Sequence, residues 1–198
     1  MPAGRRMAAP ANENVTLGIL AGGRATRLGG RDKAWLERGG VPQVLRIVRR
    51  FPEVAHVLVS ANAGLAAYAP HGLGTVADHT VGIGPLGGLE ALARACDTEW
   101  LLTLPVDVVG FNECLLPTLC AGADADGAWG EDDDGPQPLV ALWRVEALRE
   151  GASIALAADD VSVRGLQARL AMARVRFAGV RFGNLNTLDD LRAAGFDA

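Results

Sequence analysis

A short uncharged run that ends in two glycines limits how this chain can fold. Residues 15–21 contain no charged side chain, and Gly22 and Gly23 follow at once. Such a run is typical of a strand that is buried on both faces of a parallel sheet. Adjacent glycines allow a sharp turn at the strand end, and they allow successive backbone N–H groups to point toward one anion. The pattern therefore predicts a first strand that leads into a phosphate-binding turn.

The first half of the chain alternates between strand and helix patterns. Apolar runs at residues 54–61, 73–77 and 100–106 predict three further strands. The helical spacing of apolar residues predicts helices at residues 42–51 and 89–96. Alternation of this kind implies right-handed crossovers and a mostly parallel sheet, which binds ligands at the carboxyl ends of its strands.

The second half of the chain has a different pattern. Residues 123–130 and 137–144 flank an acidic segment, residues 131–136, and together they predict a hairpin that makes the sheet mixed. Carboxylates here could ligate a metal, but beside a Gly-Pro pair a solvated turn is the better interpretation, and we assign the segment no chemistry. Thr187 and Asp190 are placed to cap a last helix.

Length and composition fit one α/β domain. A chain of 198 residues that is 49% hydrophobic can bury a single core, and its 25 glycines suit many tight strand-to-helix turns. We expect a Rossmann-like three-layer αβα domain with a mostly parallel mixed sheet over residues 15–198. Residues 1–14 are expected to be a flexible leader, and they lack the apolar run of a secretory signal.

Charge and cysteine content disfavour several classes of protein. A net charge of −4 and a pI near 5.4 argue against non-specific binding of nucleic acid, which needs an excess of Lys and Arg. Cys96, Cys114 and Cys120 lack the spacing of a zinc site or a disulfide framework. We expect them to be reduced core thiols in a cytoplasmic protein. No uninterrupted apolar run is long enough to predict a membrane span.

Basic residues follow the glycine pair. Arg27 and Lys33 would add positive charge beside a phosphate bound in the turn, arginine as a two-pronged donor and lysine as a point charge. The segment is not a P-loop, because no Gly-Lys-Ser or Gly-Lys-Thr closes it. A glycine-rich surface turn with solvated basic residues is the alternative interpretation. The order of strand, glycine turn and basic residues favours phosphate binding.

Two aspartates stand near predicted strand ends. Asp107 follows the strand at residues 100–106, where a triphosphate site needs a carboxylate to hold Mg2+, although a helix cap is an alternative. Asp78 is equally compatible with an ordinary turn and with a site. The G-x-G-x-x-G match at residues 82–87 does not indicate a dinucleotide site, because Pro85 removes a backbone donor where phosphate would lie.

Residues 20–33 resemble the opening of the molybdenum cofactor guanylyltransferases, in which Leu-Ala-Gly-Gly is followed at this spacing by Arg, Gly and Asp-Lys. Further similarities follow in chain order and cover almost the whole chain after the leader: residues 59–62, 78, 84–89, 105–107, 137–139 and 184–187. Two positions depart from the family pattern. Leu28 stands where methionine is frequent, and Val108-Val109 replaces a Thr-Pro or similar pair, which leaves the backbone after Asp107 less constrained.

The resemblance implies a fold like that of the nucleotide-diphosphosugar transferases and a set of ligand contacts. Besides Gly23 in the predicted phosphate-binding turn, the residues implied to bind GTP are Leu20, Ala21, Gly22, Lys33, Asn62, Asp78 and Asp107. Asp107 would also hold Mg2+, and Arg27, Lys33 and Asp107 would supply the catalytic charges. Residues 84–88 would shape the pocket wall. Asn184 and Asn186 would lie toward the phosphate of a pterin acceptor.

The implied reaction is transfer of GMP from GTP to the terminal phosphate of molybdopterin or Mo-molybdopterin, with release of pyrophosphate. Molybdoenzyme chaperones are further candidate partners. One alternative is a molybdopterin cytidylyltransferase, although those relatives tend to carry Asp at the positions of Asn184 and Asn186. Another small NTP transferase is a second alternative. A guanine-nucleotide-binding module without catalysis is a third, and Asp107 argues against it because such a module would not need a metal carboxylate.

Overall fold

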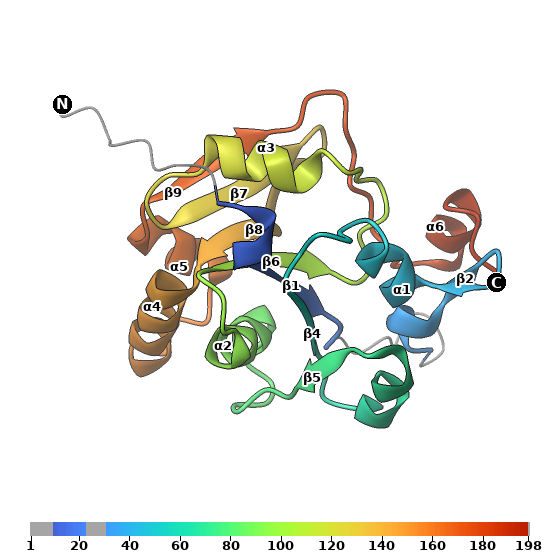
Figure 1. The fold of residues 1–198 in the computed structure, drawn as a ribbon, viewed down its shortest axis with the longest axis horizontal. Coiled ribbons are helices and arrows are strands. Elements are labelled where there is room, and N and C mark those ends of the chain that lie inside the picture. The colour runs from blue at the N-terminus through green and yellow to red at the C-terminus, as the bar shows by residue number, and fades with distance from the viewer. Residues whose placement is uncertain (1–9, 23–30, 198) are drawn as a thin grey trace.

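A computed structural model describes residues 10–22 and 31–197. Within them a seven-stranded sheet crosses the molecule in the order β5-β4-β1-β6-β8-β7-β9 (Figure 1). Its strands are β1 Val15–Leu20, β4 His56–Ser60, β5 Gly74–Val76, β6 Trp100–Pro105, β7 Gly127–Asp132, β8 Gly135–Arg144 and β9 Met172–Arg176. A separate two-stranded ribbon consists of β2 Glu37–Arg38 and β3 Val41–Pro42.

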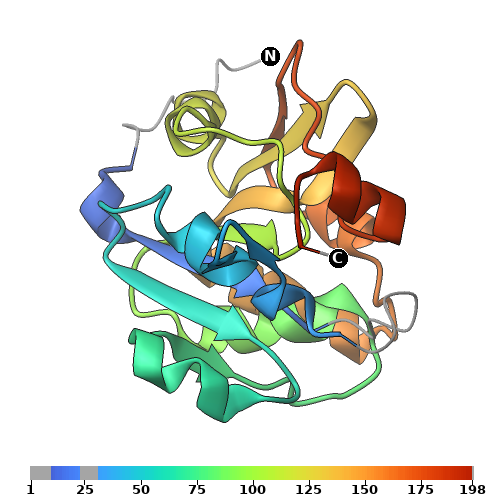
Figure 2. The same cartoon turned by 90° about the vertical axis from the view of Figure 1, so that its right-hand side faces the viewer.

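Helices cover both faces of this sheet. The α-helices are α1 Gln43–Val48, α2 Pro85–Ala95, α3 Leu115–Gly122, α4 Val145–Ala157, α5 Val163–Arg169 and α6 Leu188–Ala193. Short 3-10 helices are η1 Asn12–Asn14, η3 Lys33–Trp35, η4 Leu65–Ala67 and η5 Ala69–His71. In Figure 1, α3 lies on one side of the sheet, and α2 and α4 lie on the other. Figure 2 faces the side of the molecule that carries α6.

The sheet is mixed, as the sequence predicts. β5, β4, β1 and β6 run parallel, whereas β8 is antiparallel to both β6 and β7, and β9 is parallel to β7. Leu20 at the end of β1 lies opposite Ser60 on one side and Pro105 on the other. Three strand ends therefore reach the same level at the point where the chain changes its direction of winding. Sheets of this kind bind ligands at such a switch point.

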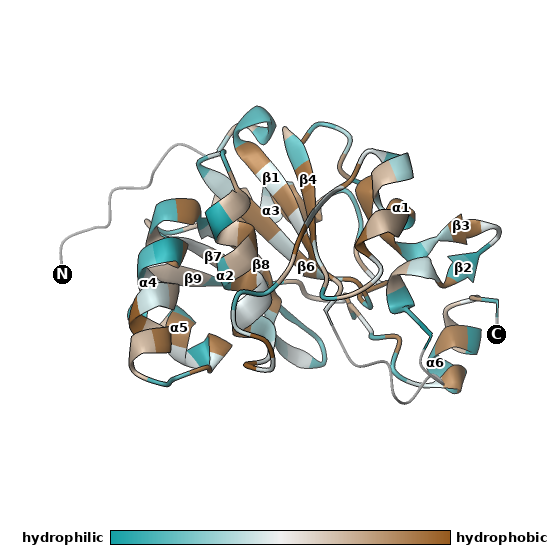
Figure 3. Cartoon of the chain, turned by 90° about the horizontal axis from the view of Figure 1, so that it is seen from below, coloured by the Kyte–Doolittle hydropathy of each residue, from teal (hydrophilic) through white to brown (hydrophobic). Residues whose placement is uncertain are grey.

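Alternating residues of the central strands pack into two hydrophobic cores, one on each face of the sheet. Leu102 and Leu104 of β6 pack into a cluster with residues of α1 and α3, whereas Leu101 of the same strand packs with α2 and α4. The period of two places successive side chains on opposite faces, so both faces of a central strand must be apolar. Figure 3 shows this as mainly hydrophobic colour along β1 and β6. The arrangement is the three-layer αβα architecture expected from the sequence.

The predicted elements of the first half are confirmed to within a few residues at each end. The strand predicted at residues 15–21 is β1, and those at 54–61, 73–77 and 100–106 are β4, β5 and β6. The predicted helices are α1 and α2. Thr187 and Asp190 form a capping box at the start of α6, also as predicted. None of the helices in residues 10–22 and 31–197 has the length and apolar character that crossing a membrane requires.

Two sequence predictions are wrong. The predicted hairpin exists as β7 and β8, but its acidic tip is not wholly a solvated turn, because Asp132 ends β7 and is 0% exposed. Alternation along β7 turns Asp132 inward while Asp133 and Asp134 make the exposed turn. The second error concerns the cysteines. Cys96 and Cys120 are buried free thiols, but Cys114 is exposed just before α3 and is not a core residue.

Candidate active site

A cavity of about 390 Å³ opens at the carboxyl ends of β1 and β6. Its lining brings together most of the residues selected from the sequence, namely Leu20, Ala21, Gly22, Lys33, Asp78, Asp107, Asn184 and Asn186. The switch point of the strand order therefore coincides with the candidate ligand residues. Gly23 and Arg27, also selected from the sequence, lie outside the described residues.

Lys33 links three distant parts of the chain in the cavity wall. It begins η3, which Asp32 caps by accepting a hydrogen bond of 2.9 Å from the backbone N–H of Ala34. Lys33 Nζ donates to Asp107 Oδ2 and to Asn186 Oδ1, each at 2.8 Å. The side chains of Lys33 and Asp107 are 20% and 21% exposed, so both charged groups remain accessible from the cavity.

The backbone around Asp107 is held by a buried glutamine of α1. Gln43 is 2% exposed, and its Nε2 donates to the carbonyl oxygens of Val106 at 3.1 Å and Val108 at 3.0 Å. The Val106 N–H donates to Leu20 O at 3.0 Å, which ties the turn to the end of β1. Asp107 lies in this turn and does not cap a helix. The hydrogen bonds of Gln43 therefore constrain the backbone after Asp107, where this chain has Val108-Val109 in place of a pair that contains proline.

Asp78 is oriented by a reciprocal pair of hydrogen bonds. Asn62 Nδ2 donates to Asp78 Oδ2 at 2.9 Å, and the Asp78 N–H donates to Asn62 Oδ1 at 2.9 Å. Ser60 Oγ lies 3.5 Å from the other carboxylate oxygen of Asp78. Asp78 lines the cavity, whereas Asn62 is not among the lining residues. The structure therefore assigns Asn62 a place beside Asp78, at the edge of the cavity.

The first turn of α2 forms another part of the wall. Gly84, Pro85 and Gly88 line the cavity, and proline suits the first position of a helix because its missing N–H is not needed there. A Cβ at Gly88 would lie 2.7 Å from Ser60 Oγ and 2.8 Å from Leu20 Cδ2. Glycine at this position lets α2 approach the ends of β1 and β4. This placement agrees with the wall expected from the resemblance at residues 84–88.

The opposite wall comes from the start of β8 and from the segment before α6. Gln137 and Asn184 line it, and the Leu185 N–H donates to Asp107 O at 3.1 Å. Asn186 is anchored through its backbone N–H, which donates to Asp190 Oδ2 at 3.0 Å. Hydrogen bonds from the side chain of Thr187 and from the Asn186 and Thr187 amides lower the pKa of Asp190. The carboxylate therefore stays ionised and holds Asn186 in place over the usual pH range.

Two residues near the site were not selected from the sequence. Gln43 is buried beside Val44 and Ile47 in α1, and a glutamine on the apolar face of a helix is a signal that a buried polar partner exists. Asp132 hydrogen-bonds to Gln137, a lining residue. The sequence feature that indicates a buried Asp132 is the alternation along β7, which turns Asp132 inward together with Ala128 and Gly130.

The fold is that of the nucleotide-diphosphosugar transferases, and solved structures share it. Molybdopterin-guanine dinucleotide biosynthesis protein A from Archaeoglobus fulgidus is similar in structure, with a TM-score of 0.70 at 18% identity, covering 91% of this chain and 96% of that chain. A nucleotidyl transferase from Methanothermobacter is also similar, with a TM-score of 0.69 at 17% identity, covering 91% of this chain and 95% of that chain.

Sequence similarity then identifies the family. Residues 17–175 match the MobA-like NTP transferase domain. The molybdenum cofactor guanylyltransferase of Yersinia pseudotuberculosis serotype O:1b is 34% identical over 182 residues, which cover 89% of this chain and 93% of the relative. The chain belongs to the MobA-like NTP transferase family and is a nucleotidyltransferase of molybdenum cofactor biosynthesis.

Proposed function

We propose that this chain transfers GMP from GTP to the terminal phosphate of molybdopterin or Mo-molybdopterin and releases pyrophosphate. The observation that carries the proposal is the position of Lys33 Nζ, 2.8 Å from both Asp107 and Asn186, in a cavity at the switch point of the sheet. One cation there faces both the implied GTP residues and the amides implied to face the acceptor. The two reacting phosphates would therefore meet beside Lys33.

Asp107 fits a role in holding Mg2+. Within residues 10–22 and 31–197, no cluster of three or more His, Cys, Asp or Glu side chains is arranged as a protein-only metal site. Mg2+ needs fewer protein ligands when a nucleotide is present, because it binds one or two carboxylates together with phosphate oxygens. Asp107 faces the cavity and is partly exposed, so it can serve as that carboxylate. When bound, Mg2+ would neutralise negative charge on the triphosphate.

The reaction needs positioning and charge more than it needs a nucleophile on the protein. An oxygen of the acceptor phosphate attacks the α-phosphorus of GTP, and the bond from that phosphorus to the oxygen shared with the β-phosphate breaks. The electron pair leaves with pyrophosphate. Lys33 would offset the negative charge that two phosphate groups bring together. The backbone of Ala21 and Gly22 at the end of β1 would border the triphosphate.

Neutral amides on the acceptor wall support a phosphate-bearing partner. Asn184, Asn186 and Gln137 can donate hydrogen bonds without adding negative charge to an anionic site. The resemblance places Asp at the two asparagine positions in cytidylyltransferases, and this chain has Asn at both. That difference is the basis for proposing guanine, and it separates this proposal from transfer of CMP.

Isothermal titration of the purified chain with GTP, CTP and ATP in the presence of Mg2+ tests the base preference. We expect GTP to bind at least tenfold more tightly than the other two, which corresponds to about 1.4 kcal/mol. Equal or tighter binding of CTP would move the chain to the cytidylyl branch. Absence of binding by all three nucleotides would contradict the proposed donor site.

A further inference from the structure

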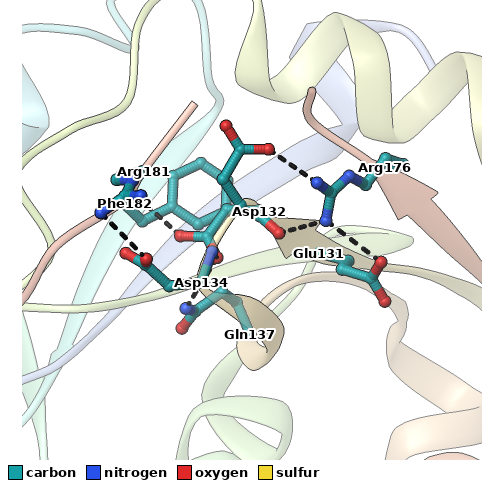
Figure 4. Close-up of polar contacts among 8 residues, drawn as sticks. Glu131, Asp132, Asp134, Gln137, Arg176, Arg181 and Phe182 are labelled. Atoms are coloured by element: carbon teal, nitrogen blue, oxygen red, sulfur yellow. Dashed lines mark hydrogen bonds and ion pairs between the residues drawn. The ribbon is translucent and has the colours of Figure 1, made fainter. Parts of the chain in front are cut away.

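Asp132 is a buried carboxylate for which the proposed reaction has no direct use. It ends β7, is 0% exposed and lies in the acidic tip of the β7–β8 hairpin (Figure 4). Burying a charge is costly unless the protein supplies hydrogen bonds. Its Oδ2 accepts from the Phe182 N–H at 2.7 Å, and its Oδ1 accepts from the Asp134 N–H at 2.9 Å and from Gln137 Nε2 at 3.2 Å.

Arg176 of β9 forms ion pairs with the two carboxylates beside Asp132, those of Glu131 and Asp133. The Arg176 guanidinium lies 3.2 Å from Glu131 Oε1, and it also donates to the backbone oxygen of Asp132 (Figure 4). It lies 2.6 Å from Asp133 Oδ1. The Asp133 N–H donates to Val180 O at 2.9 Å. The hairpin tip and the segment that follows β9 are therefore joined at several points, and Asp132 is held in a fixed frame.

Two hydrogen-bond donors, Gln137 and Phe182, connect Asp132 to the cavity. Gln137 itself lines the cavity, and its amide keeps a second N–H that can donate to an anion. Phe182 precedes Asn184 by one intervening residue, and its carbonyl oxygen accepts from Val109 N at 3.0 Å and Gly110 N at 2.7 Å. The oxygens of Asp132 thus fix the Gln137 side chain and the backbone that leads to Asn184.

Gly110 shows how closely this backbone is packed. A Cβ at Gly110 would lie 1.9 Å from Arg181 O, so a side chain there would push the segment out of place. The backbone at Arg181 and Phe182 therefore lies directly against Gly110. The bond from the Phe182 N–H to Asp132 holds this segment from one side, and the bonds from Val109 N and Gly110 N to Phe182 O hold it from the other.

We propose that Asp132 is a positioning residue for the acceptor: it orients the Gln137 amide and the backbone that carries Asn184 toward the acceptor's phosphate. This inference rests on the proposed function. The side chains assigned to GTP are oriented by other contacts, namely those between Lys33 and Asp107 and between Asn62 and Asp78. Among the described residues, the Asn184 segment hydrogen-bonds to Asp107 only at the backbone oxygen of Asp107, which accepts from the Leu185 N–H. A change at Asp132 should therefore alter the use of the acceptor and leave the use of GTP nearly unchanged.

Steady-state kinetics of Asp132→Asn with GTP and molybdopterin test this role. The asparagine keeps the shape but places an NH2 group against either the Phe182 N–H or the Gln137 amide. We expect the KM for molybdopterin to rise about tenfold, the effect of losing one hydrogen bond to a charged group. The KM for GTP should stay within about twofold. The matched control is Asp133→Asn, an exposed neighbour that contacts Arg176 and should leave both constants unchanged.

Gln137→Met supplies a second measurement that does not depend on how Asp132→Asn folds. It keeps the length of the side chain and removes the amide, so it should raise the KM for molybdopterin in the same way. Asp132→Asn already disturbs the Gln137 contact as well as the Phe182 contact, so the double variant should be no more than about twofold worse than Asp132→Asn, far from the product of the two single effects.

Several results would overturn this role. A lower melting temperature for Asp132→Asn with both KM values unchanged would make Asp132 a structural residue only. A Gln137→Met variant with a normal KM for molybdopterin would remove the proposed link to the acceptor, even if Asp132→Asn does not fold. A wild-type chain that transfers nothing would instead overturn the proposed function, and that outcome is visible before any variant is compared.

Discussion

The two halves of the sheet contribute to the cavity in different ways. In the parallel half, the candidate residues come directly after strand ends, as Ala21 follows β1 and Asp107 lies just beyond β6. In the other half, Gln137 donates to Asp132, and Asn184 follows Phe182, whose N–H donates to Asp132 from 50 residues further along the chain. Under the proposed function, the parallel half would supply the charges for chemistry, and the other half would position the acceptor.

The largest effect should follow from Asp107→Asn, which removes the carboxylate of the parallel half. Turnover should fall by about 10² to 10³, since loss of one well-placed electrostatic contact in an active site typically has this size. Binding of GTP without metal should persist, because Ala21, Gly22 and Lys33 remain. Stability should change by no more than about 1 kcal/mol, because the Lys33–Asp107 ion pair is partly exposed.

Pyrophosphate release across a Mg2+ titration measures this effect, and calorimetry without metal provides the control. Near-normal turnover with an unchanged dependence on Mg2+ would remove Asp107 from the reaction. A variant that raised only the KM for molybdopterin would contradict the division of labour between the two halves, since that outcome is expected of Asp132.

A smaller effect should follow from Gln43→Leu. Leucine keeps the volume but leaves the carbonyl oxygens of Val106 and Val108 buried without their donor, at a cost of about 1–3 kcal/mol for each unsatisfied group. The turn that carries Asp107 should loosen, and kcat should fall about tenfold because small misplacements of a catalytic group are costly. The KM for molybdopterin should change little.

Leu148→Ala is the matched control for stability in that experiment. Leu148 is buried in α4, away from the cavity lining, and its truncation should lower stability by about 2–5 kcal/mol. Unfolding in urea ranks the two variants by stability, and kinetics at a temperature where both are folded compares their turnover. If Leu148→Ala loses as much kcat as Gln43→Leu, the role of Gln43 is stability alone.

The smallest expected effect is a pH dependence of stability from Asp132. Burial by itself raises the pKa of this carboxyl, but hydrogen bonds from Phe182, Gln137, Asp134 and Gly135 outweigh burial and lower it. A pKa lowered by folding stabilises the protein above the ordinary carboxyl value of 3.8. This contribution is lost as the pH falls through the lowered pKa of the folded state.

Urea unfolding of the wild type and Asp132→Asn at a series of pH values measures this contribution. Glu131, Asp133, Asp134, Arg176 and Arg181 are common to both proteins, so their titration largely cancels in the difference. The gap in the free energy of unfolding should be widest near neutral pH and should narrow below pH 3.8. A gap that is constant from pH 7 downward would show that Asp132 does not carry its charge in the folded state.

The same two halves explain how far the sequence could predict the structure. In the parallel half, each strand and the residue after it lie together in the chain, so apolar runs and glycine turns predicted β1, β6 and the position of Asp107. In the other half, the pattern predicts the hairpin but also predicts a solvated acidic tip, and the buried Asp132 contradicts the second prediction. One hydrogen-bond donor to the buried carboxylate of Asp132 is the backbone N–H of Phe182. Because almost every residue type has a backbone N–H, the sequence does not reveal this partner.

Gln43 was missed for a related reason. Its partners are the carbonyl oxygens of Val106 and Val108, which any residue type would present. Local patterns can predict the ends of strands and the caps of helices, as they did for Thr187 and Asp190. They do not predict which buried side chain will satisfy a distant backbone group, because that pairing is decided by packing.

The most direct test of the account follows the α-phosphate of GTP during one reaction. The purified chain is mixed with Mg2+, molybdopterin and GTP labelled at the α-phosphate, and the products are separated. We predict that the label moves into a guanine dinucleotide of molybdopterin, with one pyrophosphate released for each product, and that CTP or ATP supplies little label. Label that never joins molybdopterin, or that joins it as readily from CTP, would contradict the proposed guanylyl transfer.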